Sequence, residues 1–491
     1  MPRLPAAITV LADDPTIDRA VPAGAAPEAP QDAPRAARHG LRLLVSGALA
    51  LAALSLLAPS SPTYDPWAWI VWGREIAHLD LVTTTGPSWK PLPVLFTTVF
   101  SVFGEAAPSL WLVVARAGAI AAVAIAYLLG RVLGAGRLGA AVAAIALATA
   151  PWWTVNGWLG NSEGLLVACV LGACLAHLHG HRRLAFALAV TAGLLRPEAW
   201  PFLGLYGLWL FWRQREERAV VAAGLLLLPL LWLVPEQLGS GDLLRASSRA
   251  QTDLSPGAAG RADEPALEIL RDFWALLPLG VWVGVFVAVG VAIAARRHRR
   301  VPWPVIALAV LAATWVGIVA FMASRGYSGN QRYLVAPGAI VLVLAGVGAA
   351  AVLRVLPKIL QPPVALGVLA AFALTGTLDS IDAVPETRSQ SRLAGDLEGA
   401  VERAGGTRRL RSCGPLVTEP LLIPQVAWLF GVHLQEVFDA STPGPDAAVM
   451  RAQVSPQLRP YPPASLYEGL PQRQLAEAPR WEIAVVGRCA G

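Results

Sequence analysis

The chain has 491 residues, of which 55% are hydrophobic and only 15% are charged. A soluble domain carries roughly 25% charged residues, so a chain this apolar must use the bilayer as part of its solvent. The net charge of +6 does not indicate a nucleic-acid-binding protein, because the basic residues form short clusters between apolar runs, without a basic helix or a zinc-knuckle pattern.

The N-terminal part predicts a tail, one span and an outer loop. Residues 1–38 are rich in Ala, Pro and Asp and have no apolar core, which predicts a disordered cytoplasmic tail rather than a signal peptide. An apolar run over 41–60 predicts the first span, and the polar and aromatic segment 61–93 predicts an interfacial loop on the outer side. The apolar stretch 92–103 is too short to span, so we expect a helix lying at the interface.

The following apolar runs predict a polytopic helical protein with about eleven spans in all. The further spans are expected at about 108–133, 138–155, 163–179, 183–196, 199–212, 219–235, 274–295, 302–322, 334–353 and 363–379. The predicted fold class is therefore an all-α membrane domain over 39–380, with outer loops at 61–93 and 236–272, followed by a small α/β domain over 381–491.

The basic residues predict the topology. If the N-terminus is cytoplasmic, every cytoplasmic turn is basic, as the positive-inside rule requires. These turns contain Arg131 and Arg137, residues 181–183, residues 213–218, residues 296–300, and Arg354 and Lys358. The C-terminal domain then lies outside the cytoplasm of a plasma-membrane protein, where a disulfide between Cys413 and Cys489 becomes plausible.

The polar residues that could carry chemistry gather in the predicted outer loops. Asp65, beside Trp67 and Trp69, could act as a general base because aromatic shielding restricts its hydration; the alternative is a turn or N-cap aspartate before Pro66. Lys90 is one of two lysines in the chain and could pair with a lipid phosphate, although a snorkelling interfacial lysine explains it equally well.

Two further motifs offer anion contacts. The Arg196-Pro197-Glu198 motif puts charge at a helix break between two short spans; Arg196 could hold a phosphate that Glu198 orients, or the two could form a structural ion pair. In the loop before the span at 334–353, Arg325, Asn330 and Arg332 could contact an anion, while Tyr333 could contact substrate or serve only as an interfacial anchor. No Walker A, Rossmann or zinc-spacing motif is present.

The order of a first helix, an outer loop with an early aspartate and an aromatic run, and an interfacial helix resembles the GT-C superfamily of membrane glycosyltransferases. Residues 64–94, Arg196-Pro197-Glu198 and residues 330–333 are similar to bacterial polyprenyl-phosphate-sugar transferases of the mannosyl and arabinosyl kind. Many relatives carry an acidic pair in the first loop. Here Pro66 follows Asp65, so the acidic partner would be Glu75 or Glu163.

The resemblance implies a function as well as a fold. The donor would be a sugar on a polyprenyl phosphate and the acceptor a glycan, lipid or protein of the cell envelope. Asp65 would deprotonate the acceptor hydroxyl, with inversion at the sugar, while Lys90, Arg196 or the 325–332 loop met the phosphate. The resemblance implies no particular cofactor, and use of a divalent cation is left as an alternative. The rival readings are a lipid or polysaccharide flippase and a non-catalytic envelope assembly protein.

Overall fold

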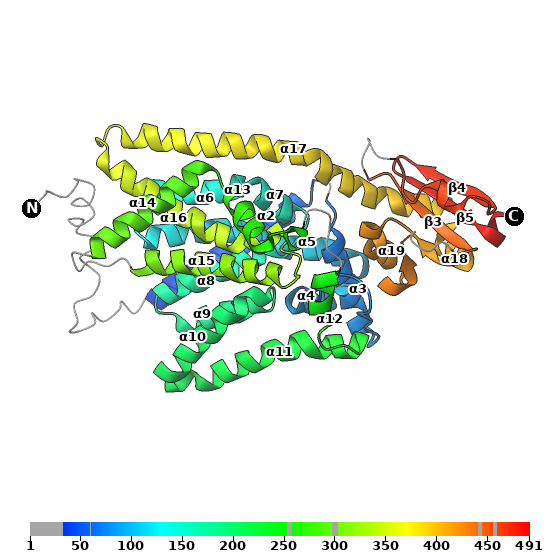
Figure 1. The fold of residues 1–491 in the computed structure, drawn as a ribbon, viewed down its shortest axis with the longest axis horizontal. Helices are drawn as coiled ribbons and strands as arrows, with labels where there is room; N and C mark the ends of the chain where they lie inside the picture. Colours follow the sequence, from blue (N-terminus) through cyan, green and yellow to red (C-terminus); the bar gives the residue numbers. More distant parts are fainter. Residues whose placement is uncertain (1–32, 59, 253–257, 297–302, 440–443, 455–458) are drawn as a thin grey trace, which may run out of the picture.

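The computed structural model describes residues 33–58, 60–252, 258–296, 303–439, 444–454 and 459–491. Its helices pack into an elongated bundle, and a small sheet domain lies at one end of that bundle (Figure 1). Most of the predicted tail and the basic residues 297–300 lie outside the described residues.

The helices account for most of the described chain. In the N-terminal half they are α2 (Ala33–Ser55), α3 (Tyr64–Ala77), α4 (Pro91–Phe100), α5 (Ala107–Val132), α6 (Gly136–Thr149), α7 (Pro151–Trp158), α8 (Glu163–Leu178), α9 (Arg182–Gly193), α10 (Trp200–Arg213) and α11 (Arg218–Ser240). They continue with α12 (Arg245–Thr252), α13 (Pro265–Ala275), α14 (Leu279–Arg296), α15 (Trp303–Ser324), α16 (Val335–Val355), α17 (Gln361–Arg403), α18 (Gly406–Ser412) and α19 (Ile423–Phe430).

The apolar helices fit a membrane by length and composition. Among the described residues, four helical runs are long and apolar enough to cross a bilayer, namely Pro91–Val132, Arg215–Ser240, Trp303–Ser324 and Gln331–Val355. The number rises to six if each of two bent pairs is one span: α6 with α7 at 58° and α13 with α14 at 95°. The count of eleven therefore stays a prediction.

Two segments predicted as loops are partly helical. Residues 61–93 contain α3, whose aromatic residues Trp69 and Trp72 are three positions apart and fully buried. That spacing is typical of a packed helix face, so the aromatic run marks a core rather than a headgroup zone. The predicted loop 236–272 contains the end of α11, all of α12 and part of α13. Both segments therefore contain helices that are too short or too polar to read as spans, and their place as outer loops stays a prediction.

The helix α16 forms the centre of the bundle and is buried along most of its length. It approaches α6 and α14 so closely that a Cβ atom on Gly346 would lie 2.4 Å from the carbonyl oxygen of Gly139. A Cβ atom on Gly348 would lie 1.8 Å from the carbonyl oxygen of Gly284. Small residues at these crossings allow the close backbone packing by which helices associate in lipid.

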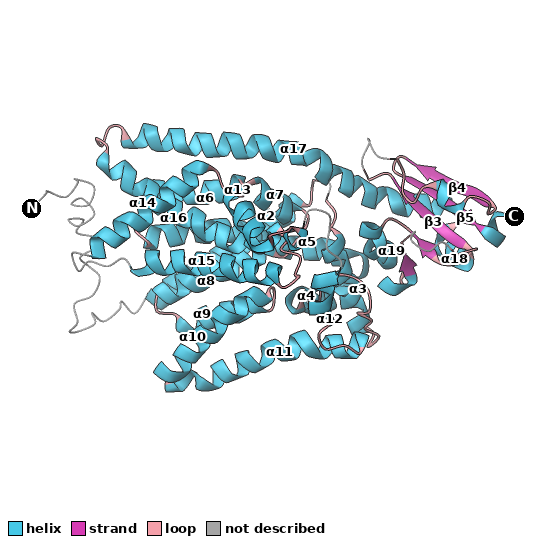
Figure 2. Cartoon of the chain, viewed as in Figure 1, coloured by secondary structure: helices cyan, strands magenta, loops and turns pink. Residues whose placement is uncertain are grey.

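The C-terminal domain contains a five-stranded sheet of order β2-β1-β3-β5-β4. Figure 2 shows its strands in magenta at the end of the helical bundle. Its strands are β1 (Leu416–Val417), β2 (Val437–Phe438), β3 (Ala447–Ala452), β4 (Gln472–Ala478) and β5 (Trp481–Val486). The first two strands and β3 run parallel, and β3, β5 and β4 run antiparallel. The 43-residue helix α17 reaches this sheet from the bundle, where the indole of Trp481 donates a hydrogen bond to the carbonyl of Leu393 at 2.7 Å.

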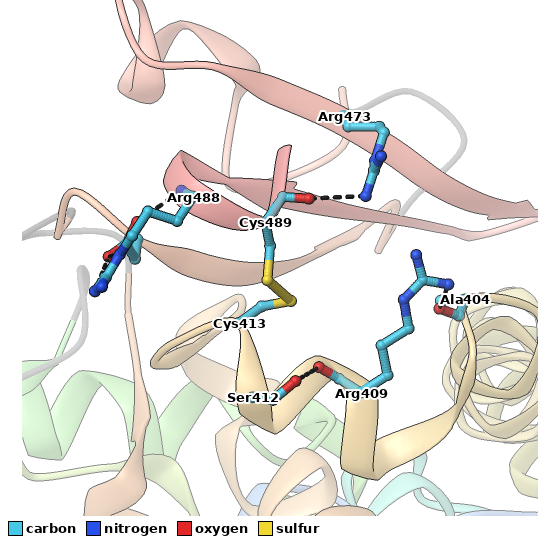
Figure 3. The surroundings of a disulfide bond; sticks show 8 residues. Ala404, Arg409, Ser412, Cys413, Arg473, Arg488 and Cys489 are labelled. Carbon is cyan, nitrogen blue, oxygen red and sulfur yellow. Dashed lines mark hydrogen bonds and ion pairs between the residues drawn. A yellow bond between two sulfur atoms is a disulfide. The ribbon is translucent and has the colours of Figure 1, made fainter. Parts of the chain in front are cut away.

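A disulfide closes the C-terminal domain. It joins Cys413, at the end of α18, to Cys489, which follows β5 (Figure 3). The two residues are 76 positions apart, so the bond links the first and last parts of the domain. This is the pairing that the sequence made plausible.

The C-terminal domain rests on α3. The guanidinium of Arg74, in the last turn of α3, donates to the carbonyl oxygens of Trp428 at 3.3 Å and Val432 at 2.7 Å. The neighbouring Glu75 accepts a hydrogen bond from His433 at 2.9 Å. The end of α3 is therefore fixed by the C-terminal domain, while its first turn points to the site described next.

Candidate functional site

Five charged side chains from distant parts of the chain meet at the beginnings of five helices. Asp65 is in the first turn of α3, Glu163 opens α8, and Arg332 is in the 3-10 turn Gln331–Leu334 that leads into α16. Lys90 directly precedes α4, and Arg196 directly precedes the 3-10 turn Pro197–Ala199 that leads into α10. A helix N-terminus carries about half a positive charge, so this convergence favours an anion.

Two prolines fix the backbone at the cationic positions. Pro91 follows Lys90 and Pro197 follows Arg196, and a residue before proline is restricted to extended conformations. Lys90 has φ −140° and ψ 111°, and Arg196 has φ −149° and ψ 127°. The backbone N–H of Leu92 also donates to the carbonyl of Leu194 at 3.3 Å, which joins the two helix starts.

Asp65 is held between two cations. Its Oδ2 atom accepts a hydrogen bond from Nη1 of Arg332 at 3.0 Å and lies 3.9 Å from Nζ of Lys90. The ammonium of Lys90 also donates to Oγ of Ser162 at 3.4 Å and lies 4.9 Å from the ring centre of Trp69. The side chain of Arg332 is 30% exposed, so this part of the cluster opens to the surroundings.

A second ion pair lies beside the first. Arg196 donates to Oε1 of Glu163, and both side chains are buried. The guanidinium of Arg196 also lies over the ring of Tyr333, 4.6 Å from its centre. Glu163 and Asp65 are both close enough to Lys90 to act on its charge, so the two pairs form one electrostatic cluster.

Besides the indole Nε1 atoms of Trp67 and Trp69, three buried atoms of charged side chains in this region have no hydrogen-bond partner within the described part of the chain. They are Oε2 of Glu163, Nε of Arg196 and Oε2 of Glu198. Buried polar groups in native proteins are nearly always hydrogen-bonded, and each exception requires an explanation. A polar ligand bound among these side chains would satisfy them.

The surroundings lower the pKa of both Asp65 and Lys90, which favours the charged form of the carboxylate but disfavours the charged form of the ammonium. Burial raises the pKa of Asp65, but Arg332 and Lys90 more than offset it, so the carboxyl pKa lies below its ordinary value. Burial and the nearby Arg196 lower the pKa of Lys90 to about 7. At neutral pH Asp65 is therefore ionised, whereas Lys90 is close to the point where its charge is lost.

The other candidates lie at different places. Asn330 caps the turn, its side chain accepting from the backbone N–H of Arg332 at 3.0 Å. Arg325 is exposed and lies over the ring of Phe321, away from the cluster. Glu75 contacts the C-terminal domain through His433, so the structure does not bring it to Asp65. Asp65 and Glu75 are ten residues apart on one helix, or roughly 15 Å.

Ser162 is a part of the site that the sequence did not single out, whereas Trp69 was expected beside Asp65. Ser162 directly precedes Glu163, and its hydroxyl contacts Lys90. The segment before α8 is also tied to α3, because Oγ1 of Thr63 donates to Oδ1 of Asn161 at 3.1 Å. The cluster of polar residues over 156–163 was the available signal, but it did not specify which helix start they would face.

The cluster does not fit a divalent cation. Within the described ranges, no three His, Cys, Asp or Glu side chains lie close enough to hold a metal ion. Asp65 and Glu163 are each paired with an arginine, and a metal would have to displace those cations. Hard divalent cations need several oxygen ligands, and the nearby positive charges of Lys90, Arg196 and Arg332 oppose their binding here.

An apolar cavity of about 380 Å³ lies between α8, α9, α10 and α15. Its lining includes Ala199, three residues after Arg196, as well as Phe202 and Trp315. The indole of Trp315 donates to the carbonyl of Tyr333 at 3.2 Å, next to the cluster. The cavity extends from this polar end to His177 at its other end.

The comparisons with known proteins identify the fold. The structure is similar to ArnT from Cupriavidus metallidurans bound to undecaprenyl phosphate, with a TM-score of 0.58 and 15% identity over 92% of this chain and 99% of ArnT. For the apo state of ArnT the TM-score is 0.57 and the identity 16%, over 92% of this chain and 98% of ArnT. An oligosaccharyltransferase from Archaeoglobus fulgidus gives a TM-score of 0.46 at 13% identity, over 79% of this chain and 61% of that protein.

No family model matches the sequence, and no curated protein matches it either. The likeness to ArnT nevertheless covers almost the whole of both chains. It confirms the predicted GT-C-like fold and the polytopic, mostly helical class, while the number of spans is left open.

Proposed function

We propose that this protein is a membrane glycosyltransferase that moves a sugar from a polyprenyl-phosphate donor to an acceptor hydroxyl of the cell envelope. The observation that carries the proposal is the placement of Asp65 between Lys90 and Arg332, where five helix N-termini converge. This arrangement joins a candidate base to groups that bind an anion. The fold likeness to ArnT, which has been observed with undecaprenyl phosphate, supports a lipid-linked donor.

The donor phosphate would bind at the cationic side of the cluster. Lys90 is the natural contact, because its 3.9 Å separation from Asp65 leaves it loosely paired. Nε of Arg196, which has no partner in the described structure, offers a second donor. Once the phosphate draws Lys90 away, Asp65 loses part of the positive field that depresses its pKa and becomes a stronger base.

The chemistry is then a single displacement. Asp65 takes the proton of the acceptor hydroxyl, whose oxygen forms a bond to the anomeric carbon from the face opposite the phosphate. The bond between that carbon and the phosphate oxygen breaks, and the polyprenyl phosphate leaves with the electron pair. The configuration inverts. Lys90 and Arg196 stabilise the charge that grows on the departing phosphate.

The cavity beside the cluster provides a place for the lipid. Its walls are almost entirely apolar, and it begins within one helical turn of Arg196. A prenyl chain bound there would keep the phosphate beside Lys90 and Arg196 while its sugar faced Asp65. A cavity of this size holds part of a long chain, and the remainder would extend into the bilayer.

We also propose the orientation that the basic turns predict. The N-terminus would be cytoplasmic, and the cluster and the C-terminal domain would lie on the outer side, where nucleotide sugars are absent and a lipid-linked donor is required. The disulfide between Cys413 and Cys489 supports an oxidising compartment. The C-terminal domain, which contacts α3, would border the acceptor side of the site.

The proposal is tested by the Asp65→Asn variant in membranes that contain a polyprenyl-phosphate sugar. We expect sugar transfer to fall by about 10²–10⁴-fold, the usual contribution of a general base, while donor binding persists. The matched control is Asp263→Asn, an exposed carboxylate in the segment before α13, which should transfer at the wild-type rate.

Because Asp65→Asn leaves Arg332 without its partner, the double variant Asp65→Asn with Arg332→Gln separates folding from chemistry. It should insert normally and remain inactive. Full transfer by a folded Asp65→Asn variant would remove Asp65 from the mechanism. If the wild type moved the lipid across the bilayer but transferred no sugar, the result would instead support the alternative function as a flippase.

A further inference from the structure

Arg116 is a buried cation that the proposed glycosyl transfer does not use. It lies in α5, nine residues from the helix start, and only 4% of its surface is exposed. Its Nε and Nη2 atoms donate to the carbonyl of Trp158 at 3.2 and 2.8 Å, and its Nη1 donates to Oγ of Ser55 at 2.8 Å. No carboxylate among the described residues forms an ion pair with it.

The hydrogen bonds leave two N–H donors unused, and the guanidinium lies over the ring of Trp158, 4.3 Å from its centre, which offsets only part of its charge. A guanidinium has five N–H groups, and three of them are accounted for by Trp158 and Ser55. The carbonyl of Trp158 ends α7, so Arg116 caps that helix, but an eight-residue helix supplies about half a negative charge at most. Buried charges in membrane domains are otherwise paired or functional, because an uncompensated one is costly.

A cavity of about 250 Å³ lies directly beside this guanidinium. Besides Arg116 and Ser55, it is lined by Val123 and Ile120 of α5 and by Trp158 of α7. The volume is below the roughly 300 Å³ at which pockets for drug-sized molecules begin, and it suits a headgroup phosphate rather than a sugar-bearing lipid.

The position of the cavity indicates where its ligand comes from. Ser55 is the last residue of α2, so the guanidinium lies level with the end of that helix, on the side of Asp65. The neighbouring Leu51 and Leu54 of α2 are 56% and 60% exposed, which is expected for a surface that faces lipid tails. Arg116 lies nine residues inside α5, but the end of α2 brings polar surroundings to the depth of its guanidinium, which is where a lipid phosphate could reach it.

We propose that Arg116 and this cavity bind the phosphate of an anionic membrane lipid from the leaflet on the Asp65 side. The site is separate from Lys90 and does not depend on sugar transfer. The ligand class is a lipid phosphate, carried either by an anionic phospholipid or by a polyprenyl phosphate. The bound phosphate supplies the charge that Trp158 and Ser55 do not.

The test is lipid binding to the purified full-length protein, measured by native mass spectrometry and by thermal shift. The probes are phosphatidylglycerol and undecaprenyl phosphate, with phosphatidylcholine as the zwitterionic reference. We expect one or both anionic lipids to bind and stabilise the wild type, and Arg116→Gln to weaken that binding by about tenfold, the loss of one charge-assisted hydrogen bond. The control Arg131→Gln, exposed at the other end of α5, should bind as the wild type does.

A second variant keeps the test decisive if Arg116→Gln does not fold. Val123→Phe fills the cavity but retains Arg116, and it should lose the anionic lipid while remaining inserted. Phosphatidylglycerol and undecaprenyl phosphate distinguish the two sources of the phosphate, because the lipid that binds more tightly identifies which kind of lipid the cavity takes. Undiminished binding by folded Arg116→Gln or Val123→Phe, or equal binding of phosphatidylcholine, would overturn the proposal. Because Asp65→Asn leaves this cavity unchanged, its lipid binding should persist even if the transferase assignment fails.

Discussion

At the level of single residues, the titration of Lys90 makes the charge of the site depend on pH. Burial and Arg196 lower its pKa to about 7, whereas the pKa of Asp65 lies below its ordinary value. A lysine is charged below its pKa, so free Lys90 is cationic in mild acid and loses its charge as the pH rises through about 7. Asp65 is ionised across that whole range, so its protonation does not lower the transfer rate near neutral pH.

The pH profile of kcat/KM for the donor should therefore decline above pH 7. A sugar linked through a phosphodiester keeps one negative charge throughout, so the decline reports the free enzyme. In Lys90→Arg the cation does not titrate, and we expect the alkaline decline to disappear even if the maximal rate is lower. The measurement is initial transfer rate against pH at limiting donor. An identical decline in Lys90→Arg would assign it to another group.

The comparison of Glu75 with Glu163 shows what sequence reasoning could provide at this scale. It identified Asp65, Lys90, Arg196 and Arg332 by residue type and by their place between apolar runs. It could not choose the acidic neighbour, because closeness in sequence favours Glu75 whereas the helical rise of α3 carries Glu75 to the opposite end. Glu163 enters the cluster only through tertiary packing.

At the level of elements, a polar network fixes the segment that leads into Lys90. Arg245, which opens α12, donates to the carbonyl oxygens of Gly86 and Pro87, both at 3.2 Å. It also pairs with Glu236 of α11 at 3.4 Å, and the side chain of Glu236 is completely buried. Gly86 has φ +92°, a conformation that favours glycine, so its carbonyl can face Arg245.

Arg245→Met should raise the KM for the donor by about tenfold, because the segment that positions Lys90 loses its anchor. It should also destabilise the protein by about 3 kcal/mol, since it leaves Glu236 buried with only the hydrogen bond from Thr83. The double variant Glu236→Gln with Arg245→Met removes both charges and should recover much of that stability. We expect the KM to remain high in the double variant, as transfer kinetics and thermal unfolding would show. Recovery of KM together with stability would reduce Arg245 to a purely structural residue.

The elements themselves could be predicted where periodicity and length agree. The long apolar helices α5, α11, α15 and α16 match the expected runs closely. Helices that are short and bury their face against protein rather than lipid, such as α3 and α12, have no such signal in the sequence. The proline at 151 also divides the expected span 138–155 into α6 and α7, a bend that hydropathy does not encode.

At the level of the whole molecule, the orientation can be measured directly. Glu468 is exposed on the C-terminal domain, so Glu468→Cys should react with a membrane-impermeant maleimide added to intact cells. Cys413 and Cys489 are bonded, and the two free cysteines lie in the apolar helix α8, Cys169 buried and Cys174 half-buried, which keeps their reaction low. Wild-type cells provide the control for residual labelling. Labelling only after lysis would place the C-terminal domain in the cytoplasm and invert the proposed topology.

The two ends of α3 make different contacts. Its first turn bears Asp65 of the charged cluster, and its last turn bears Arg74 and Glu75, which form hydrogen bonds with the C-terminal domain. Its 14 residues make a rod roughly 21 Å long. A helix of this length is stiff enough for a displacement at one end to move the other end. If the acceptor shifted the C-terminal domain on binding, α3 would move and displace the carboxylate of Asp65. Binding of the acceptor and alignment of Asp65 as the base would then be coupled.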